Sequence, residues 1–95
     1  MTFNDLLDEI KELRAKKSHD YARTDDQFSN LRACEVMGIP AWVGILIRMG
    51  DKFSRLQQLT TREAKVKESI RDNLMDIAVY ALLAIILYER NTEKR

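Results

Sequence analysis

The segment E-S-I-R-D-N-L-M-D-I-A-V-Y-A-L-L-A-I-I-L-Y, residues 68–88, decides the fold of this 95-residue chain. Its first half places Glu68, Asp72 and Asp76 at four-residue intervals, which puts the three carboxylates on one face of a helix. Its second half, Ile77 to Tyr88, contains only apolar residues and tyrosine. We therefore predict a long helix with an acidic stripe at its start and a buried surface at its end.

The N-terminal third of the chain predicts two more helices. Apolar residues recur at steps of three and four over residues 3–13, which indicates an amphipathic first helix ending near Lys17. Thr24 and Gln27 have the spacing of a capping box, in which each residue bonds a free amide of the first helical turn. They predict a short second helix that ends at Gly38.

The middle of the chain predicts a third helix and the start of the long one. Pro40 stands where a helix tolerates proline, in its first turn, and the helix should run through about Leu59. Thr60 and Glu63 form another capping box. The fourth helix is therefore expected over about residues 61–90.

These elements predict an all-α fold, a four-helix bundle in a single domain over residues 1–95. No segment alternates with the period of two that a half-buried strand needs. A chain of this size buries only about 60–65% of its unfolded surface when it folds alone. We therefore expect a homo-oligomer, a dimer or a tetramer.

Composition restricts the setting and the partners. A formal net charge of +1 gives no electrostatic reason to bind a nucleic-acid polymer or an anionic membrane. The N-terminus lacks the basic-then-apolar order of a signal peptide, and the apolar run from Ile77 is much shorter than the roughly 20 residues that cross a bilayer. Cys34 is the only cysteine, which excludes an internal disulfide. We predict a cytoplasmic location.

The third and fourth helices should form an antiparallel pair with charged residues on both members. The third helix carries a basic stripe of Arg48, Lys52 and Arg55 beside its apolar face. A turn centred near Thr61 would bring three pairs level: Arg55 with Glu68, Asp51 with Asp72, and Arg48 with Asp76.

Two interpretations of these charges remain open. The basic and acidic side chains could form a salt-bridge ladder that only fixes the helix register. Alternatively, the Asp51 and Asp72 carboxylates, once forced together, would either share a proton or bind a divalent cation such as Mg²⁺, and with a bound cation the arginines would hold phosphates. An acid beside such an ion could orient a water molecule for attack on a phosphoanhydride.

Four segments carry a resemblance to a known family: K-K-S-H-D-Y-A, F-S-N-L-R-A-C-E, R-M-G-D-K-F-S-R-L and the segment from Glu68 to Leu83. Over about residues 10–88 the chain resembles small phage and bacterial proteins of the nucleotide-modification-associated, MazG-like group. These are similar to the all-α nucleoside triphosphate pyrophosphohydrolases, which include MazG and the dimeric dUTPases. The resemblance implies an oligomeric helical bundle that uses Mg²⁺ to cleave a nucleoside triphosphate to monophosphate and pyrophosphate.

The resemblance also implies a set of site residues. The superfamily pattern is E-x-x-E on one helix and E-x-x-D on a later helix. The later pair corresponds to Asp72 and Asp76, preceded by Glu68, and the earlier pair has one counterpart, Glu35, because Arg32 stands at its partner's position. The expected metal ligands are therefore Glu35, Glu68, Asp72 and Asp76.

The remaining candidates follow from their positions near these acids. We expect Asp51 and Asp72 to act in catalysis, with Asp51 replacing the missing acid. The expected nucleotide contacts are Lys17, Tyr21, Arg48, Lys52, Arg55, Asn73 and Tyr80. A protein that binds a nucleotide without hydrolysing it is the alternative function, and Arg32 in place of a metal-binding acid favours it.

Overall fold

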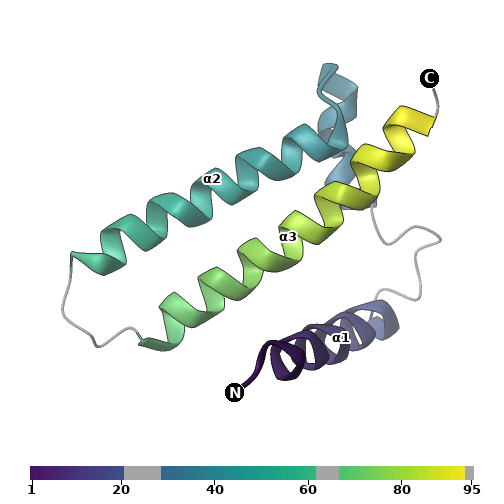
Figure 1. Cartoon of the computed structure of the whole chain (residues 1–95). Helices are drawn as coiled ribbons and strands as arrows, with labels where there is room; N and C mark the ends of the chain where they lie inside the picture. The colour runs from purple at the N-terminus through teal and green to yellow at the C-terminus, as the bar shows by residue number, and fades with distance from the viewer. Residues whose placement is uncertain (21–28, 62–66, 94–95) are drawn as a thin grey trace. The chain divides into compact units, whose positions relative to one another are not determined.

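The computed structural model describes residues 1–20, 29–61 and 67–93 (Figure 1). They form α1 (Phe3–Asp20), the 3₁₀ helix η1 (Ser29–Met37), α2 (Ala41–Thr60) and α3 (Lys67–Glu93). These ranges contain no strand, which confirms the all-α prediction. The chain divides into two compact units, Met1–Asn30 and Leu31–Arg95.

The first unit contains α1, which extends beyond its predicted end near Lys17. Its start is fixed by a reciprocal capping box that sequence reasoning missed. The Thr2 amide donates to Asp5 Oδ2 at 2.9 Å, and the Asp5 amide donates to Thr2 Oγ1 at 3.1 Å. Hydrogen bonding to Thr2 lowers the pKa of the Asp5 carboxyl. The Thr2 amide has the larger effect, and the Thr2 hydroxyl has the smaller one.

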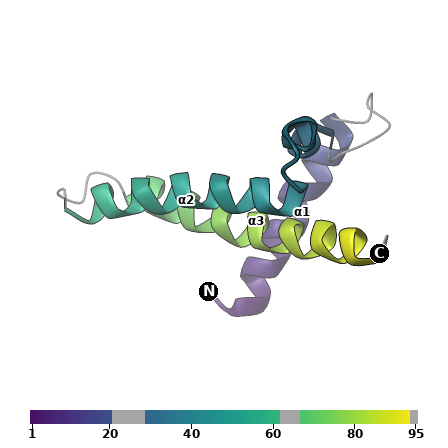
Figure 2. The ribbon, with the colours of Figure 1, turned by 90° about the horizontal axis from the view of Figure 1, so that it is seen from above.

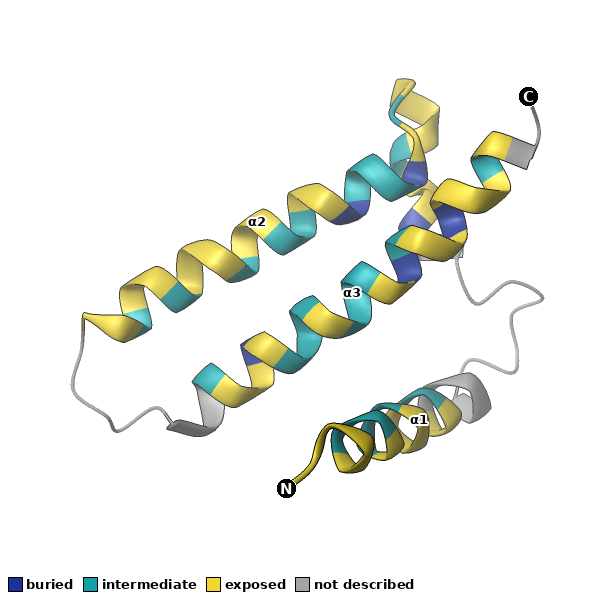
Figure 3. Ribbon diagram, in the orientation of Figure 1, coloured by how far each residue is buried: buried dark blue, intermediate teal, exposed yellow. Residues whose placement is uncertain are grey.

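The second unit is built on an antiparallel hairpin of α2 and α3, which run side by side in both views (Figures 1 and 2). The helices are level where Lys52 meets Asp76 and where the Trp42 ring meets Tyr88. Among the described residues five apolar side chains are buried, four in the half of the hairpin next to η1 and one in η1 itself (Figure 3). They are Ala41, Ile45, Leu83 and Leu87 of the hairpin and Leu31 of η1.

The 3₁₀ helix η1 is held against α2 by a close contact. A Cβ atom on Gly44 would lie 2.6 Å from Cys34 Sγ, so the absence of a side chain at this position lets η1 approach the helix. The chain leaves η1 through Gly38, whose φ of 81° lies in the left-handed region that glycine adopts without strain. The predicted end of the second helix is thus confirmed, while its predicted start at Thr24 and Gln27 lies outside the described residues.

The start of α2 differs slightly from expectation. Pro40 precedes the first residue of the helix as its N-cap, and its carbonyl accepts hydrogen bonds from the amides of Val43 and Gly44 at 3.0 and 3.1 Å. A proline at this boundary costs no intrahelical hydrogen bond, because its missing N–H lies in the unpaired first turn.

The predicted start of the fourth helix near Thr61 is wrong, because Thr61 is the C-cap of α2, and the structure describes α3 as Lys67–Glu93. The hydroxyl groups of Thr60 and Thr61 donate to the carbonyls of Gln57 and Gln58, each at 2.8 Å. Both threonines therefore close the end of α2, where carbonyl groups lack partners. The register of the two helices therefore differs from the one predicted for a turn centred near Thr61.

Within the described ranges, no single helix combines the length and the apolar composition needed to span a membrane. The segments Leu31–Met37 and Ala41–Thr60 meet that test only when they are joined across a bend of 114°.

Candidate functional site on the polar side of the hairpin

One side of the hairpin carries most of the charged candidates, and we call it the polar side. It is formed by Arg48, Lys52 and Arg55 on α2 and by Asp72 and Asp76 on α3. Lys52 Nζ lies 2.9 Å from Asp76 Oδ2, and this ion pair joins the two helices. The Lys52 side chain is mostly buried, whereas that of Asp76 is about half exposed. The site is therefore open to a ligand on its acidic half.

The observed register corrects the pairing predicted for these charges. Lys52, rather than Arg48, stands opposite Asp76. Asp72 comes level with Leu56, one helical turn from Asp76 along α3. Asp51 is exposed and is five residues from Leu56. At 1.5 Å per residue, it lies about 7 Å from the level of Asp72 along the hairpin axis. The expected juxtaposition of Asp51 with Asp72 is therefore wrong, and a shared cation between them has no geometric support.

The acids of α3 still form a row on one face of the helix. Asp72 is exposed and Asp76 half-buried, and residues four apart have Cβ atoms about 6 Å apart. Their carboxylates can therefore reach one ion together. Glu68 belongs to α3, but its side chain lies outside the described part of the chain. Two helical turns separate it from Asp76, so Asp72 is the acid able to share an ion with either neighbour.

Two neighbouring candidates point towards the interior of the hairpin. Asn73 is 7% exposed, and Tyr80 is half-buried. The Oδ1 atom of Asn73 is shielded from solvent and accepts no hydrogen bond from the described residues, while the residue takes part in another interaction. Nucleotide contact by Asn73 stays a prediction, and its burial leaves little surface for it.

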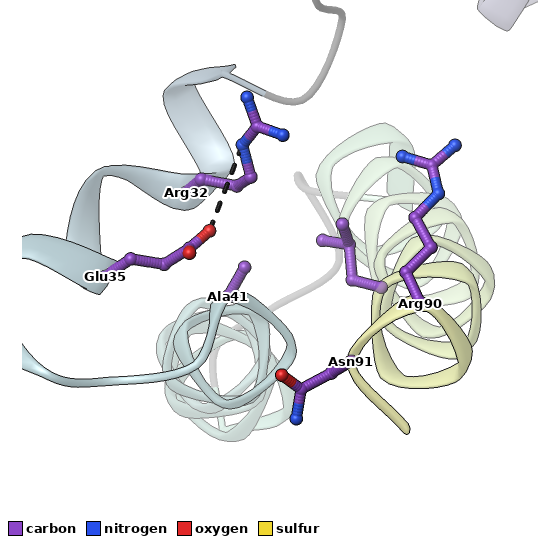
Figure 4. A pocket seen from close by; sticks show the side chains of 6 residues that line it. Arg32, Glu35, Ala41, Arg90 and Asn91 are labelled. Carbon is purple, nitrogen blue, oxygen red and sulfur yellow. Dashed lines mark ion pairs between the residues drawn. The ribbon is translucent and has the colours of Figure 1, made fainter. Parts of the chain in front are cut away.

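Glu35 lies at the other end of the hairpin (Figure 4). It lines a small pocket with five residues: Arg32, Ala41, Leu87, Arg90 and Asn91. Arg32 Nε lies 3.9 Å from Glu35 Oε1, a long and exposed ion pair. Leu87 is eleven residues from Asp76, which corresponds to about 16 Å along α3. The structure therefore does not bring Glu35 to Asp72 and Asp76 within this unit, and its role as a metal ligand stays a prediction.

The pocket also shows what sequence reasoning missed. Arg90 and Asn91 come from the last turns of α3 and border the pocket beside Glu35. The sequence pattern of the fourth helix does not indicate them, because only the register of the hairpin brings the end of α3 level with the start of α2. The remaining nucleotide candidates, Tyr21 and the Lys17 side chain, lie outside the described residues.

Asp72 and Asp76 fit a magnesium site in which the protein supplies only one or two of the ligands. Over residues 1–20, 29–61 and 67–93, side chains whose atoms are described include no group of three or more acids, histidines or cysteines able to hold a metal. Mg²⁺ commonly takes only one or two carboxylates and completes its shell with water and substrate phosphates. Asp72 and Asp76 meet that need.

Comparison with known families identifies the family of this chain. A model of the family described as nucleotide modification associated domain 1 matches residues 17–87. The chain belongs to this family. The match to the nucleotide-modification-associated family includes η1, α2 and the part of α3 that carries Asp72 and Asp76. No curated protein and no solved structure matches the chain.

Proposed function

We propose that the polar side of the hairpin binds a nucleoside triphosphate with Mg²⁺ and cleaves it to nucleoside monophosphate and pyrophosphate. The observation that carries the proposal is the row of Asp72 and Asp76 facing Lys52, in a chain of the nucleotide-modification-associated family. The proposed setting is the cytoplasm, and the proposed assembly is a dimer or tetramer.

The Lys52–Asp76 ion pair defines what a bound cation would displace. The ammonium group lies 2.9 Å from Asp76 Oδ2 and balances this carboxylate, so Mg²⁺ at Asp76 would take the place of Lys52. Asp72 and Asp76, with Glu68 one turn earlier, would hold Mg²⁺. When bound, the ion neutralises phosphate oxygens and lowers the pKa of a coordinated water.

The basic residues of α2 have a matching role. Release of Lys52 from Asp76 makes its ammonium group available to a phosphate oxygen. Arg48 and Arg55 lie about one turn on either side of Lys52 and can extend that contact, because guanidinium groups bind phosphate in bidentate fashion. The polar side thus offers acids and cations in parallel rows, as a metal–triphosphate complex requires.

The assignment of the attacking water follows from the register. Asp72 lies within the acidic row and is exposed, so it can both contact the ion and orient a water molecule. Asp51 is displaced along the hairpin, and its catalytic role stays a prediction that the Asp51→Asn variant tests directly.

Two observations favour a second function, nucleotide binding without hydrolysis. The described acids provide two close carboxylates rather than four. Arg32 stands where the superfamily pattern has an acid, and it is engaged with Glu35. A protein with this site would retain the nucleotide and its metal but turn it over slowly or not at all.

One experiment separates the two functions. The chain is incubated with a panel of ribo- and deoxyribonucleoside triphosphates and Mg²⁺, and both released pyrophosphate and retained nucleotide are measured. We expect Mg²⁺-dependent pyrophosphate release that Asp72→Asn lowers at least about 100-fold, since it removes a charge from the acidic row. Asp8→Asn, an equivalent change at an exposed acid of α1, is the control and should leave the rate unchanged.

Retention of a nucleotide without pyrophosphate release would select the binding function. Neither retention nor release with any nucleotide would reject both, and the charged rows would then serve only the register of the hairpin.

A further inference from the structure

The pocket at the end of the hairpin next to η1 brings two arginines together (Figure 4). Arg32 of η1 and Arg90 of α3 stand on opposite sides of it. The apolar part of the lining consists of the buried side chains of Ala41 and Leu87, and Asn91 beside them is half-buried. Three elements that are distant in the sequence thus place two guanidinium groups around one small cavity.

The lining of this pocket carries more positive than negative charge. Its two guanidinium groups are accompanied by one carboxylate, that of Glu35. The pocket also borders the N-terminus of α2, since Ala41 is the first residue of that helix and no described side chain caps it. A helix N-terminus contributes about half a positive charge, so the surplus is about +1.5. A phosphate group carries a charge of about −1.5 to −2 at neutral pH, which matches this surplus.

The contact between Arg32 and Glu35 is weak enough for an anion to replace it. Arg32 Nε lies 3.9 Å from Glu35 Oε1, beyond the roughly 2.7–3.2 Å of an N–H···O hydrogen bond. The side chains of Arg32 and Glu35 are 44% and 50% exposed, so solvent screens their attraction. An oxyanion that accepts direct hydrogen bonds from Arg32 would therefore compete well with Glu35.

The size of the cavity limits the ligand to a single small group. Its volume of about 70 Å³ corresponds to roughly five water molecules, at about 15 Å³ each. Pockets that enclose a whole small-molecule ligand measure roughly 300–1,000 Å³. A tetrahedral phosphate presents oxygens to guanidinium groups on opposite sides at once, whereas a planar carboxylate presents both of its oxygens in one direction.

We propose that this pocket binds a phosphate group, either as the free ion or at the end of a small molecule. Arg32 and Arg90 contact its oxygens from opposite sides, and the side-chain amide of Asn91 donates to it. The N-terminus of α2 adds its partial charge. Leu87 lies about 16 Å along α3 from Asp76, and the site requires no metal ion. Phosphate binding here is therefore independent of the hydrolysis proposed for the polar side.

The test is an NMR titration of the isotope-labelled chain with inorganic phosphate, at constant ionic strength and without Mg²⁺ or nucleotide. The Nε–H signals of Arg32 and Arg90 and the side-chain amide signals of Asn91 report on the pocket itself. We expect saturable shifts of these signals and at least about tenfold weaker binding in Arg90→Gln. Arg71→Gln, the same change at an exposed arginine near the start of α3, is the control and should not alter the titration.

A second variant should change the affinity in the opposite direction. Glu35→Gln removes the carboxylate from the pocket lining and should strengthen phosphate binding at least about threefold, because the anion no longer meets a like charge. A gain of affinity cannot arise from a loss of folding. If Arg90→Gln loses its helical circular dichroism, Arg90→Lys keeps the charge and should still weaken binding, because it lacks the planar fork of donors.

Three results would overturn the phosphate site. They are unshifted pocket signals in the wild type, equal weakening by Arg90→Gln and Arg71→Gln, and an affinity for acetate equal to that for phosphate. Methyl phosphate in place of inorganic phosphate distinguishes the two sources of the group: tighter binding of the ester indicates a phosphorylated small molecule, and tighter binding of inorganic phosphate indicates the free ion. Pyrophosphate release with Mg²⁺ and nucleotide is measured separately and reports on the polar side alone.

Discussion

The two ends of the α2–α3 hairpin differ in chemistry. Next to η1, Ile45 and its neighbours form the apolar core, and Ile45 is 1% exposed. Towards the connection, the helices meet through the Lys52–Asp76 ion pair and the buried amide of Asn73. Burial of apolar surface stabilises a fold far more than a partly exposed ion pair does. The hairpin therefore gains most of its stability at the end next to η1, whereas Lys52, Asp72 and Asp76 lie towards the connection. Substitutions at the two ends should therefore separate effects on stability from effects on nucleotide binding.

The largest expected effect on stability is at the core end. Ile45→Ala removes a fully buried side chain and should lower the free energy of unfolding by about 2–5 kcal/mol. Ile47→Ala makes the same change two residues away, at a side chain that is 57% exposed, and should change it by less than about 0.5 kcal/mol. Urea denaturation followed by circular dichroism measures both. Equal losses would mean that the core is not where the structure places it.

The next effect tests the contact between η1 and α2. Gly44→Ala brings a methyl group against Cys34 Sγ and should cost about 1–3 kcal/mol of unfolding free energy. The double variant with Cys34→Ala should recover most of this loss, since the contacting sulfur is gone.

Gly50→Ala is the matched control for that contact. Apart from its chain neighbours and the nearby backbone of α2, no heavy atom lies within 4 Å of a Cβ on Gly50. Alanine also favours the helix, so the change should stabilise the chain by about 0.5–1 kcal/mol. The same denaturation series measures it, and a loss of stability there would contradict the open space around Gly50.

A smaller effect is expected at the connection end. Lys52→Gln or Asp76→Asn should lower the unfolding free energy by no more than about 1 kcal/mol, because the ion pair is partly exposed and screened by salt. The same variants should reduce nucleotide binding strongly if the polar side is the site. A loss of several kcal/mol with unchanged binding would instead assign the pair a purely structural role.

The smallest effect concerns the start of α1 and its dependence on pH. The pKa of Asp5 is lowered by its bonds to Thr2, so the folded state binds this proton less readily than the unfolded state. The stabilisation is present above the ordinary pKa of 3.8 and is lost as the pH falls through the lowered value. Amide chemical shifts of the first turn should follow this titration, and Thr2→Val should move the Asp5 pKa back towards 3.8.

Periodicity predicted the helices well, since apolar spacing reports directly on helix faces. The acidic row and the basic stripe follow from the same helical spacing, and the end of the second helix follows from the glycine at position 38. The 3₁₀ conformation of η1 was not predicted, because a 3₁₀ segment of nine residues is unusual and apolar spacing does not distinguish it from a short α-helix.

The register of the hairpin was the main error, and it had a local cause. The sequence predicts Thr60 as the N-cap of the next helix, yet the hydroxyl groups of Thr60 and Thr61 both donate to carbonyls of α2. Threonine can satisfy either end of a helix, and its sequence neighbours did not distinguish them. Because Thr61 ends α2, the register differs from the predicted one, and Lys52 rather than Arg48 lies opposite Asp76. The predicted contact between Asp51 and Asp72 is lost for the same reason.

The candidate site was predicted less completely than the fold because it depends on contacts between elements. The acids of α3 follow from one helix and survive any register. The distance from Glu35 to Asp76 depends on where η1 meets the hairpin, and the sequence carries no periodic signal for that contact.

The most direct test of the central claim is the binding of Mn²⁺, as a substitute for Mg²⁺, measured by the electron paramagnetic resonance signal of the free ion. The titration uses the wild type and Asp72→Asn, each with a non-hydrolysable nucleoside triphosphate. If the acidic row holds the metal–triphosphate complex, the wild type should remove Mn²⁺ from solution beyond what nucleotide alone removes, and Asp72→Asn should bind it at least about tenfold more weakly. Identical titrations for the two proteins, or a free-ion signal that the wild type does not change, would contradict the claim.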